Sequence, residues 1–182
     1  MSLQLLIIVC ACLVQQINGW QNNLDGLLDY QCPNKNQFIN HVISQHHNHE
    51  EDRQFDFTCS DVVSGYDDLT TTCTYSGWVN SFDQPVNFRC PDDGFIHGMR
   101  SEHNNHNEDR IWGFFCCKIP EIHMISCEHT GWTNDWDGDQ SFYVPPEHVM
   151  VGVTSEHDNH HEDRRFAYEV CRILQGGEII AG

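Results

Sequence analysis

One polar segment of twelve residues is written three times in this chain. It reads SQHHNHEEDRQF at 44–55, SEHNNHNEDRIW at 101–112 and SEHDNHHEDRRF at 155–166. Each copy lies in a longer unit that begins at Trp20, Trp78 or Trp132, with Asn two residues later and Asp five residues later. Internal repetition restricts a chain to architectures built from one recurring structural unit. We therefore predict one domain, residues 20–182, made of three repeats that span 20–77, 78–131 and 132–182.

Apolar alternation around the polar segments predicts β-strands. In the second unit Phe95, His97 and Met99 face the same way, and a period of two is typical of strands. The intervening turns are rich in Asn, which tolerates the dihedral angles of tight turns. Gly98 and Gly152, inside predicted strands, indicate a bulge or a close backbone approach. The predicted fold class is all-β, with three pseudo-symmetric repeats in a trefoil- or prism-like arrangement, each a hairpin with a polar tip.

The N-terminal residues 1–19, MSLQLLIIVCACLVQQING, form a short apolar run that ends in small and polar residues. This pattern is typical of a secretory signal peptide. The run is too short to span a bilayer, and no later stretch is more apolar. We therefore expect no membrane span and a mature chain that is secreted into the extracellular space or matrix.

The cysteines predict a disulfide framework. Removal of Cys10 and Cys12 with the signal peptide leaves eight of the ten cysteines, and an even number in an exported chain indicates disulfides. The first two units each hold two cysteines 27 residues apart at equivalent places, while the third unit lacks the opening one. The predicted pairs are Cys32–Cys59, Cys90–Cys117, Cys73–Cys116 and Cys127–Cys171.

The charge limits the classes of partner. The chain has 27 acidic and 9 basic residues, a net charge of −18 with neutral histidine. Such a field disfavours nucleic acid and anionic membrane surfaces and favours cationic partners and divalent ions. We do not expect an enzyme, because a nucleophile and its base need one asymmetric, water-excluding pocket, whereas this motif occurs three times.

The Asp-Arg-x-aromatic part of each polar segment has two possible roles. Arg and the aromatic residue share a strand face, where the guanidinium can lie near the ring and a carboxylate can accept from it in a fork. The group can order the turn, or it can bind sugar hydroxyls, sulfate or a protein partner at three sites together. The candidate ligand-binding residues are Asp52, Arg53, Phe55, Asp109, Arg110, Trp112, Asp163, Arg164 and Phe166.

The histidines of the turns give a weaker hypothesis, a divalent-cation site. Imidazole ligates zinc or copper and carboxylates ligate calcium, but the spacing matches no defined metal motif, and no cofactor is otherwise expected. The candidate metal ligands are His46, His49, His103, His106, His157 and His160.

Taken together, these motifs resemble the dermatopontin family, and most of all its invertebrate branch of hemagglutinins and amebocyte aggregation factors. The resemblance covers residues 20–182 and rests on Trp-x-Asn, Cys-Pro and Asp-Arg-x-[Phe/Trp] before a closing cysteine. It implies a secreted, non-enzymatic matrix protein linked to collagen fibril organisation and cell–matrix adhesion, with matrix proteins and proteoglycans as partners. The alternative that it implies is a multivalent lectin-like hemagglutinin or cell-aggregation factor that binds cell-surface glycans.

Two details follow from the resemblance. The family's disulfide pattern fits Cys32–Cys59 and Cys90–Cys117. Tyrosine sulfation, which the family's tyrosine-rich members imply, has one plausible position here, Tyr66 beside Asp67 and Asp68.

Overall fold

The computed structural model describes residues 19–64, 70–120, 122–175 and 178–180. The predicted signal peptide, apart from Gly19, and the predicted sulfation site at Tyr66 lie outside these residues. Within the described ranges, no helix has the length and apolar character needed to cross a membrane.

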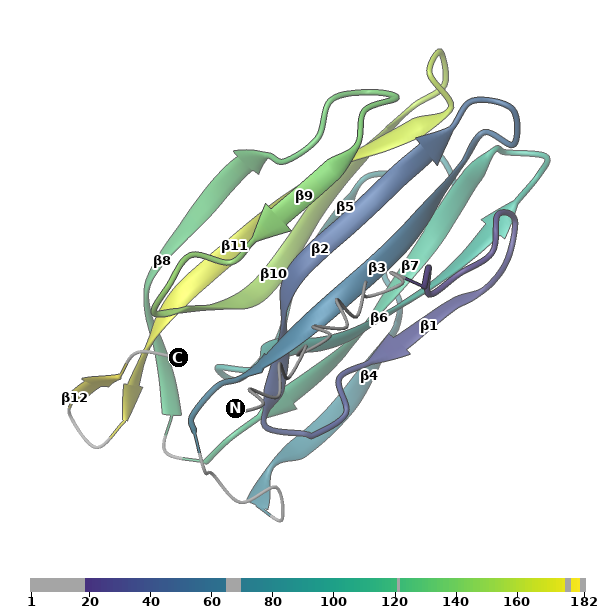
Figure 1. Cartoon of the computed structure of the whole chain (residues 1–182). Coiled ribbons are helices and arrows are strands. Elements are labelled where there is room, and N and C mark those ends of the chain that lie inside the picture. The colour runs from purple at the N-terminus through teal and green to yellow at the C-terminus, as the bar shows by residue number, and fades with distance from the viewer. Residues whose placement is uncertain (1–18, 65–69, 121, 176–177, 181–182) are drawn as a thin grey trace, which may run out of the picture.

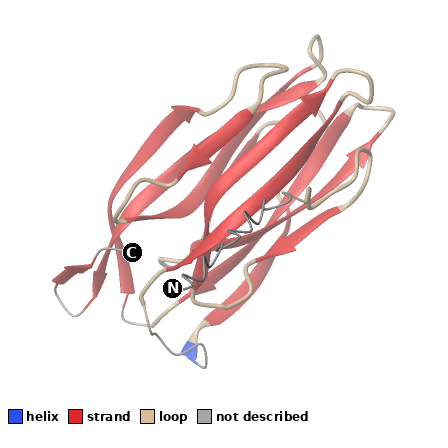
Figure 2. Cartoon of the chain, in the orientation of Figure 1, coloured by secondary structure: helices blue, strands red, loops and turns tan. Residues whose placement is uncertain are grey.

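The fold is all-β, as predicted, and strands dominate the chain (Figure 2). Three long antiparallel hairpins each carry one copy of the polar segment at the tip, which confirms the hairpins expected from the period-two alternation. In chain order the strands are β1 (Leu28–Gln31), β2 (Gln37–His47), β3 (Asp52–Asp61), β4 (Thr72–Trp78), β5 (Val86–Arg89), β6 (Phe95–Asn104), β7 (Asp109–Lys118), β8 (Ile122–Trp132), β9 (Gln140–Tyr143), β10 (His148–Asp158), β11 (Asp163–Gln175) and β12 (Glu178–Ile180).

Each hairpin is completed by a strand from another unit. The sheets have the orders β1-β6-β7-β4, β12-β11-β10-β5 and β3-β2-β9, and β8 pairs with the free side of β11. Thus β1 from the first unit joins β6 of the second, β5 from the second joins β10 of the third, and β9 from the third returns to β2 of the first. The three units are therefore joined in a closed cycle of strand exchange. The trefoil- or prism-like arrangement stays a prediction.

The bulges expected at the strand glycines are present. The register shifts between Ile96 and Gly98 in one hairpin and between Met150 and Gly152 in another. At Gly98 an added Cβ would collide with the backbone oxygen of Tyr30 in β1. Glycine at this position therefore lets the exchanged strand approach closely, as a strand glycine often does.

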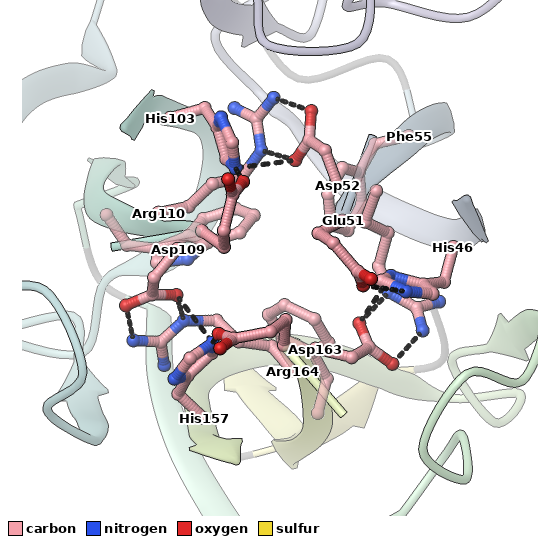
Figure 3. Close-up of a pocket in the computed structure, with 15 residues that line it drawn as sticks. His46, Glu51, Asp52, Phe55, His103, Asp109, Arg110, His157, Asp163 and Arg164 are labelled. Carbon is pink, nitrogen blue, oxygen red and sulfur yellow. Dashed lines mark hydrogen bonds and ion pairs between the residues drawn. The ribbon is translucent and has the colours of Figure 1, made fainter. Parts of the chain in front are cut away.

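The three hairpin tips lie at the same end of the molecule, where β2–β3, β6–β7 and β10–β11 turn (Figure 1). Their side chains converge on one hollow (Figure 3). The hollow is thus built by all three units, and no single unit contains it.

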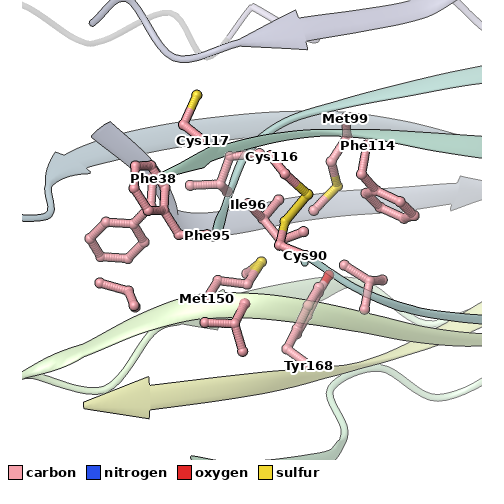
Figure 4. Packing of buried hydrophobic residues seen from close by; sticks show 14 of the residues in the cluster. Phe38, Cys90, Phe95, Ile96, Met99, Phe114, Cys116, Cys117, Met150 and Tyr168 are labelled. Atoms are coloured by element: carbon pink, nitrogen blue, oxygen red, sulfur yellow. A yellow bond between two sulfur atoms is a disulfide. The ribbon is translucent and has the colours of Figure 1, made fainter. Parts of the chain in front are cut away.

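The apolar core lies where the sheets face one another (Figure 4). Phe38, Ile96 and Met150 come from three different hairpins and are at most 3% exposed. The disulfide between Cys90 and Cys116 runs among these side chains, so it anchors the second hairpin within the core.

Two of the four predicted disulfides are correct and two are wrong. The structure has Cys32–Cys59 and Cys127–Cys171 as predicted, but Cys90 pairs with Cys116 and Cys73 with Cys117, instead of Cys90–Cys117 and Cys73–Cys116. The Asp-Arg pair gives the reason. Cys59 and Cys116 each follow the motif aspartate by seven residues, whereas Cys117 and Cys171 follow it by eight. Neighbouring positions on a strand point to opposite faces, so the two sets bind different partners.

The second set, Cys117 and Cys171, links the second and third hairpins to flanking strands. Cys117 of β7 bonds to β4, and Cys171 of β11 bonds to β8. Ser60 of β3 stands at the equivalent place, and among the described residues no strand flanks the outer edge of β3. The first hairpin therefore has no strand there to receive a disulfide.

Candidate functional site

The hollow at the hairpin tips is partly open to solvent and has a cavity volume of about 20 Å³. Five kinds of side chain line it, each contributed once by every unit (Figure 3). They are the histidines His46, His103 and His157; the glutamates Glu51, Glu108 and Glu162; the aspartates Asp52, Asp109 and Asp163; the arginines Arg53, Arg110 and Arg164; and the aromatic residues Phe55, Trp112 and Phe166.

A ring of ion pairs between units forms the wall of the hollow. Each motif arginine makes a bidentate contact with the motif aspartate of a different unit, and all six side chains are at most 5% exposed. The pairs, with Nε–O and Nη2–O distances, are Arg53–Asp163 at 3.0 and 2.6 Å, Arg110–Asp52 at 2.6 and 2.7 Å, and Arg164–Asp109 at 2.5 and 2.7 Å.

Further hydrogen bonds fix the arginines in this ring. Arg110 also donates to the backbone oxygen of Gly26, in the loop of the preceding unit, and to the hydroxyl of Ser101 on its own hairpin. Arg53 is held in the same way by Gly138 and Ser44. The motif serine therefore orients the guanidinium, and the guanidinium ties two units together.

The asparagine of Trp-x-Asn extends the edge of each hairpin. The Asn22 side chain donates to the backbone oxygen of Arg53 and accepts from the backbone N–H of Phe55. Asn80 and Asn134 make the same two contacts in their own units. An amide side chain that pairs like a backbone group explains why each unit opens with this motif.

The aromatic residues form the floor of the hollow. Phe55, Trp112 and Phe166 meet edge to face, with ring centroids 5.3 to 5.7 Å apart, and each is at most 3% exposed. This geometry is favourable for aromatic pairs. The cation–π contacts of the described residues belong to Arg100 and Arg165 and not to the motif arginines, so the motif arginines are held by carboxylates instead.

Three histidines and the carboxylates beside them form the rim of the hollow. The His46, His103 and His157 side chains are at most 1% exposed, and each lies 3.3 to 3.9 Å from three carboxylate oxygens. One carboxylate of each set comes from the histidine's own unit, Glu51, Glu108 or Glu162, and two come from another unit. These glutamates adopt positive φ angles of 43 to 47°, a region that few residues other than glycine adopt.

The surrounding charges shift the pKa values of three groups at this rim, His46, Asp163 and Glu162. Burial lowers the pKa of His46, but the Asp163 and Asp137 carboxylates outweigh burial and raise it. Burial would raise the pKa of Asp163, yet His46 and Arg53 hold it at about 2. Burial raises the pKa of Glu162; His157 opposes this shift, and Glu51, Asp83 and Glu108, which belong to the other two units, add to it.

The structure brings together all nine predicted ligand-binding residues, but it buries them against one another. The charged groups of the three arginines and three aspartates are engaged in the ring, whereas Trp112 Nε1 is buried without a hydrogen-bond partner among the described residues. Of the six candidate metal ligands, His46, His103 and His157 line the hollow with buried side chains, whereas the exposed His49, His106 and His160 lie outside it on the turns.

Two sets of carboxylates that lie beside the histidines were not predicted as site residues. One set is Glu51, Glu108 and Glu162, and the other is Asp25, Asp83 and Asp137. Both recur at the same position in each unit, so their recurrence was a usable signal.

Comparison with known proteins gives one consistent result. The family model described as Dermatopontin matches residues 22–175. The chain is 39% identical to the hemagglutinin/amebocyte aggregation factor of Limulus polyphemus over 85% of this chain and 88% of that protein. It is 33% identical to the dermatopontin of Biomphalaria glabrata, over 82% and 98%, and 33% identical to Millepora cytotoxin-1 of Millepora dichotoma, over 82% and 65%.

No solved structure matches this chain. The family is established by the match of the Dermatopontin model over most of the chain. That match includes all three of the tryptophan-led motifs from their asparagine onward and all three Asp-Arg-x-aromatic motifs. This chain belongs to the dermatopontin family.

Proposed function

We propose that this protein acts outside the cell as a non-enzymatic adhesion or aggregation protein that joins matrix components or cells. The single observation that carries the proposal is that three similar hairpin tips, held by interlocked ion pairs, are presented at one end of a disulfide-bonded frame. A rigid frame with several equivalent contact points binds with avidity that exceeds the affinity of each point.

The disulfides and the relatives support an extracellular location. This chain has four disulfides. Disulfides persist in oxidising compartments and are rare in the cytosol. A relative 39% identical is named for hemagglutination and amebocyte aggregation, and two others are named dermatopontin. Collagen fibril organisation, cell–matrix adhesion and binding to matrix proteins or proteoglycans are the finer functions that we propose for this chain.

A lectin-like function is the second candidate, and the exposed aromatic residues favour it. Trp132 is 39% exposed, and the Arg165 guanidinium lies 4.2 Å from its ring and 4.9 Å from that of Trp136. His161 of the third hairpin tip stacks on Trp136. Trp and Arg are enriched among the residues that dominate binding energy, so this stack is where we expect glycans to bind.

The deciding experiment is agglutination of fixed cells by the purified mature chain, with and without competing sugars. Clumping that a sugar blocks and that Trp132→Ala abolishes supports the lectin function. Arg172→Ala, which changes an exposed arginine paired with Glu147, is the matched control. If the cells do not clump but the protein changes the rate at which turbidity rises during collagen fibril formation, the result supports a role in matrix assembly. No effect in either assay contradicts the proposed function.

A further inference from the structure

The histidine–carboxylate contacts at the rim of the hollow have an unusual length. All nine distances lie between 3.3 and 3.9 Å, whereas a direct N–H···O hydrogen bond spans about 2.7–3.2 Å. Among the described residues, both ring nitrogens of His46 and His103 and Nε2 of His157 have no hydrogen-bond partner, although they are buried. Buried polar atoms without a partner call for an explanation.

A metal ion bound by Nδ1 of His103 and by Asp25 fits the shortest of the distances around this histidine. Two ligand atoms that each lie about 2.0–2.1 Å from a tetrahedral zinc ion are roughly 3.3 Å apart. Nδ1 of His103 lies 3.4 Å from a carboxylate oxygen of Asp25. Ligand atoms of His103, Asp25 and Asp52 all lie within 4.8 Å of one another, and so do those of His157, Asp83 and Asp109.

The charge of each group also suits a divalent cation. Around His103, the carboxylates of Asp25, Asp52 and Glu108 and the guanidinium of Arg110 sum to −2 when the histidine is neutral (−3 + 1). Asp52 already accepts from Arg110, but a carboxylate has lone pairs for further contacts. Asp25 and Glu108 are 39% and 33% exposed, so an ion can reach the group from solvent.

We propose that the rim of the hollow binds divalent transition-metal ions, represented by Zn²⁺, at the histidine–carboxylate groups centred on His103 and His157. Imidazole nitrogen and carboxylate oxygen are ligands that zinc prefers. In each group the histidine and the aspartates belong to different units, so a bound ion links two units of the cycle. The inference is independent of which partner the protein binds outside the cell.

The test is calorimetric titration of ZnCl₂ into the EDTA-treated mature chain, with its disulfides intact and no polyhistidine tag. We expect at least two ions per chain and a higher thermal midpoint. His103→Gln and Asp25→Asn should each weaken binding at one site by about tenfold or more, the scale set by changes to outer-shell ligand partners. Because Asp25 is partly exposed, its variant tests the site even if the His103 variant does not fold.

The exposed histidines of the same turns supply the matched controls. His106→Gln and His160→Gln should leave zinc affinity within about twofold of the parent chain, because these residues lie outside the hollow. Equal losses in these variants and in His103→Gln would assign binding to the turn surface and overturn the proposal. Absence of zinc binding by the parent chain would also overturn it.

Discussion

Arg110 of the second unit and Asp52 of the first form a buried bidentate ion pair, with 2.6 and 2.7 Å between the paired nitrogen and oxygen atoms. Equivalent pairs join the third unit to the second and the first to the third. A buried charge that loses its partner is strongly unfavourable. The stability of each unit therefore depends on the others.

Arg110→Ala should lower the free energy of unfolding by about 3–5 kcal/mol, because it leaves Asp52 charged, buried and unpaired. Urea denaturation measures this loss. Arg172→Ala, which removes an exposed partner of Glu147, should cost about 0–1 kcal/mol. Equal losses in the two variants would contradict a stabilising role for the ring.

Acid should destabilise the fold through Asp163. Its pKa is 3.8 when unperturbed and about 2 in the fold, so its stabilising effect is complete above pH 4 and is lost as the pH falls through 2. The difference corresponds to about 2 kcal/mol. Thermal midpoints measured between pH 5 and pH 1.5 should fall most steeply in this window.

His46 should act in the opposite sense at higher pH. Because its folded pKa is raised, its contribution is complete below the unfolded value and is lost as the pH rises through the folded value. His49→Gln, at an exposed position on the same turn, should leave this dependence unchanged, whereas His46→Gln should remove it. A pH profile that is identical in both variants would refute this assignment.

Cys90→Ser should release one thiol, and tandem mass spectrometry after alkylation should place it at Cys116. Labelling at Cys117 would contradict the observed pairing. The double variant Cys73→Ser/Cys117→Ser removes a bond that closes a separation of 44 residues, so it should cost about 4 kcal/mol by the loop-entropy relation. The comparison in urea should use the chain with all disulfides as the reference.

Gly98→Ala should destabilise the fold by about 1–3 kcal/mol, the usual cost of overpacking. The new methyl group would meet the backbone of β1 at Tyr30, which cannot rotate away. Gly138→Ala is the control, since its added Cβ would lie no closer than 3.2 Å to any neighbouring atom. A Gly98 variant as stable as the control would show that β1 can shift outward at little cost.

The local features of the fold could be read from the sequence. Alternating Phe95, His97 and Met99 predicted a strand, and the Asn-rich turns placed the hairpin tips, because both signals depend on neighbours in the chain. The strands that complete the sheets have only four residues each, β1, β5 and β9. Their partners are set by closure of the whole cycle, which no local pattern encodes.

The candidate site shows the same division. Recurrence identified Asp52 and Arg110 as important, but not that they pair with each other across two units. The predicted pairs Cys90–Cys117 and Cys73–Cys116 were wrong because they relied on an equal spacing of 27 residues between cysteines. The Asp-Arg pair aligns the units correctly and places Cys116, not Cys117, at the position equivalent to Cys59. The carboxylates of Asp25 and Glu108 recur in each unit, yet only the folded chain places them beside His103.

The cycle of strand exchange also determines when folding can be completed during synthesis. The first hairpin, β2–β3, acquires its outer strand only when β9 arrives, and His41 then pairs with Tyr143. Contacts between residues so far apart in sequence make folding slow, because a long loop must close before they form. The sheet of the N-terminal unit therefore stays incomplete until β9 has been synthesised, so the first unit cannot finish folding before most of the chain has left the ribosome.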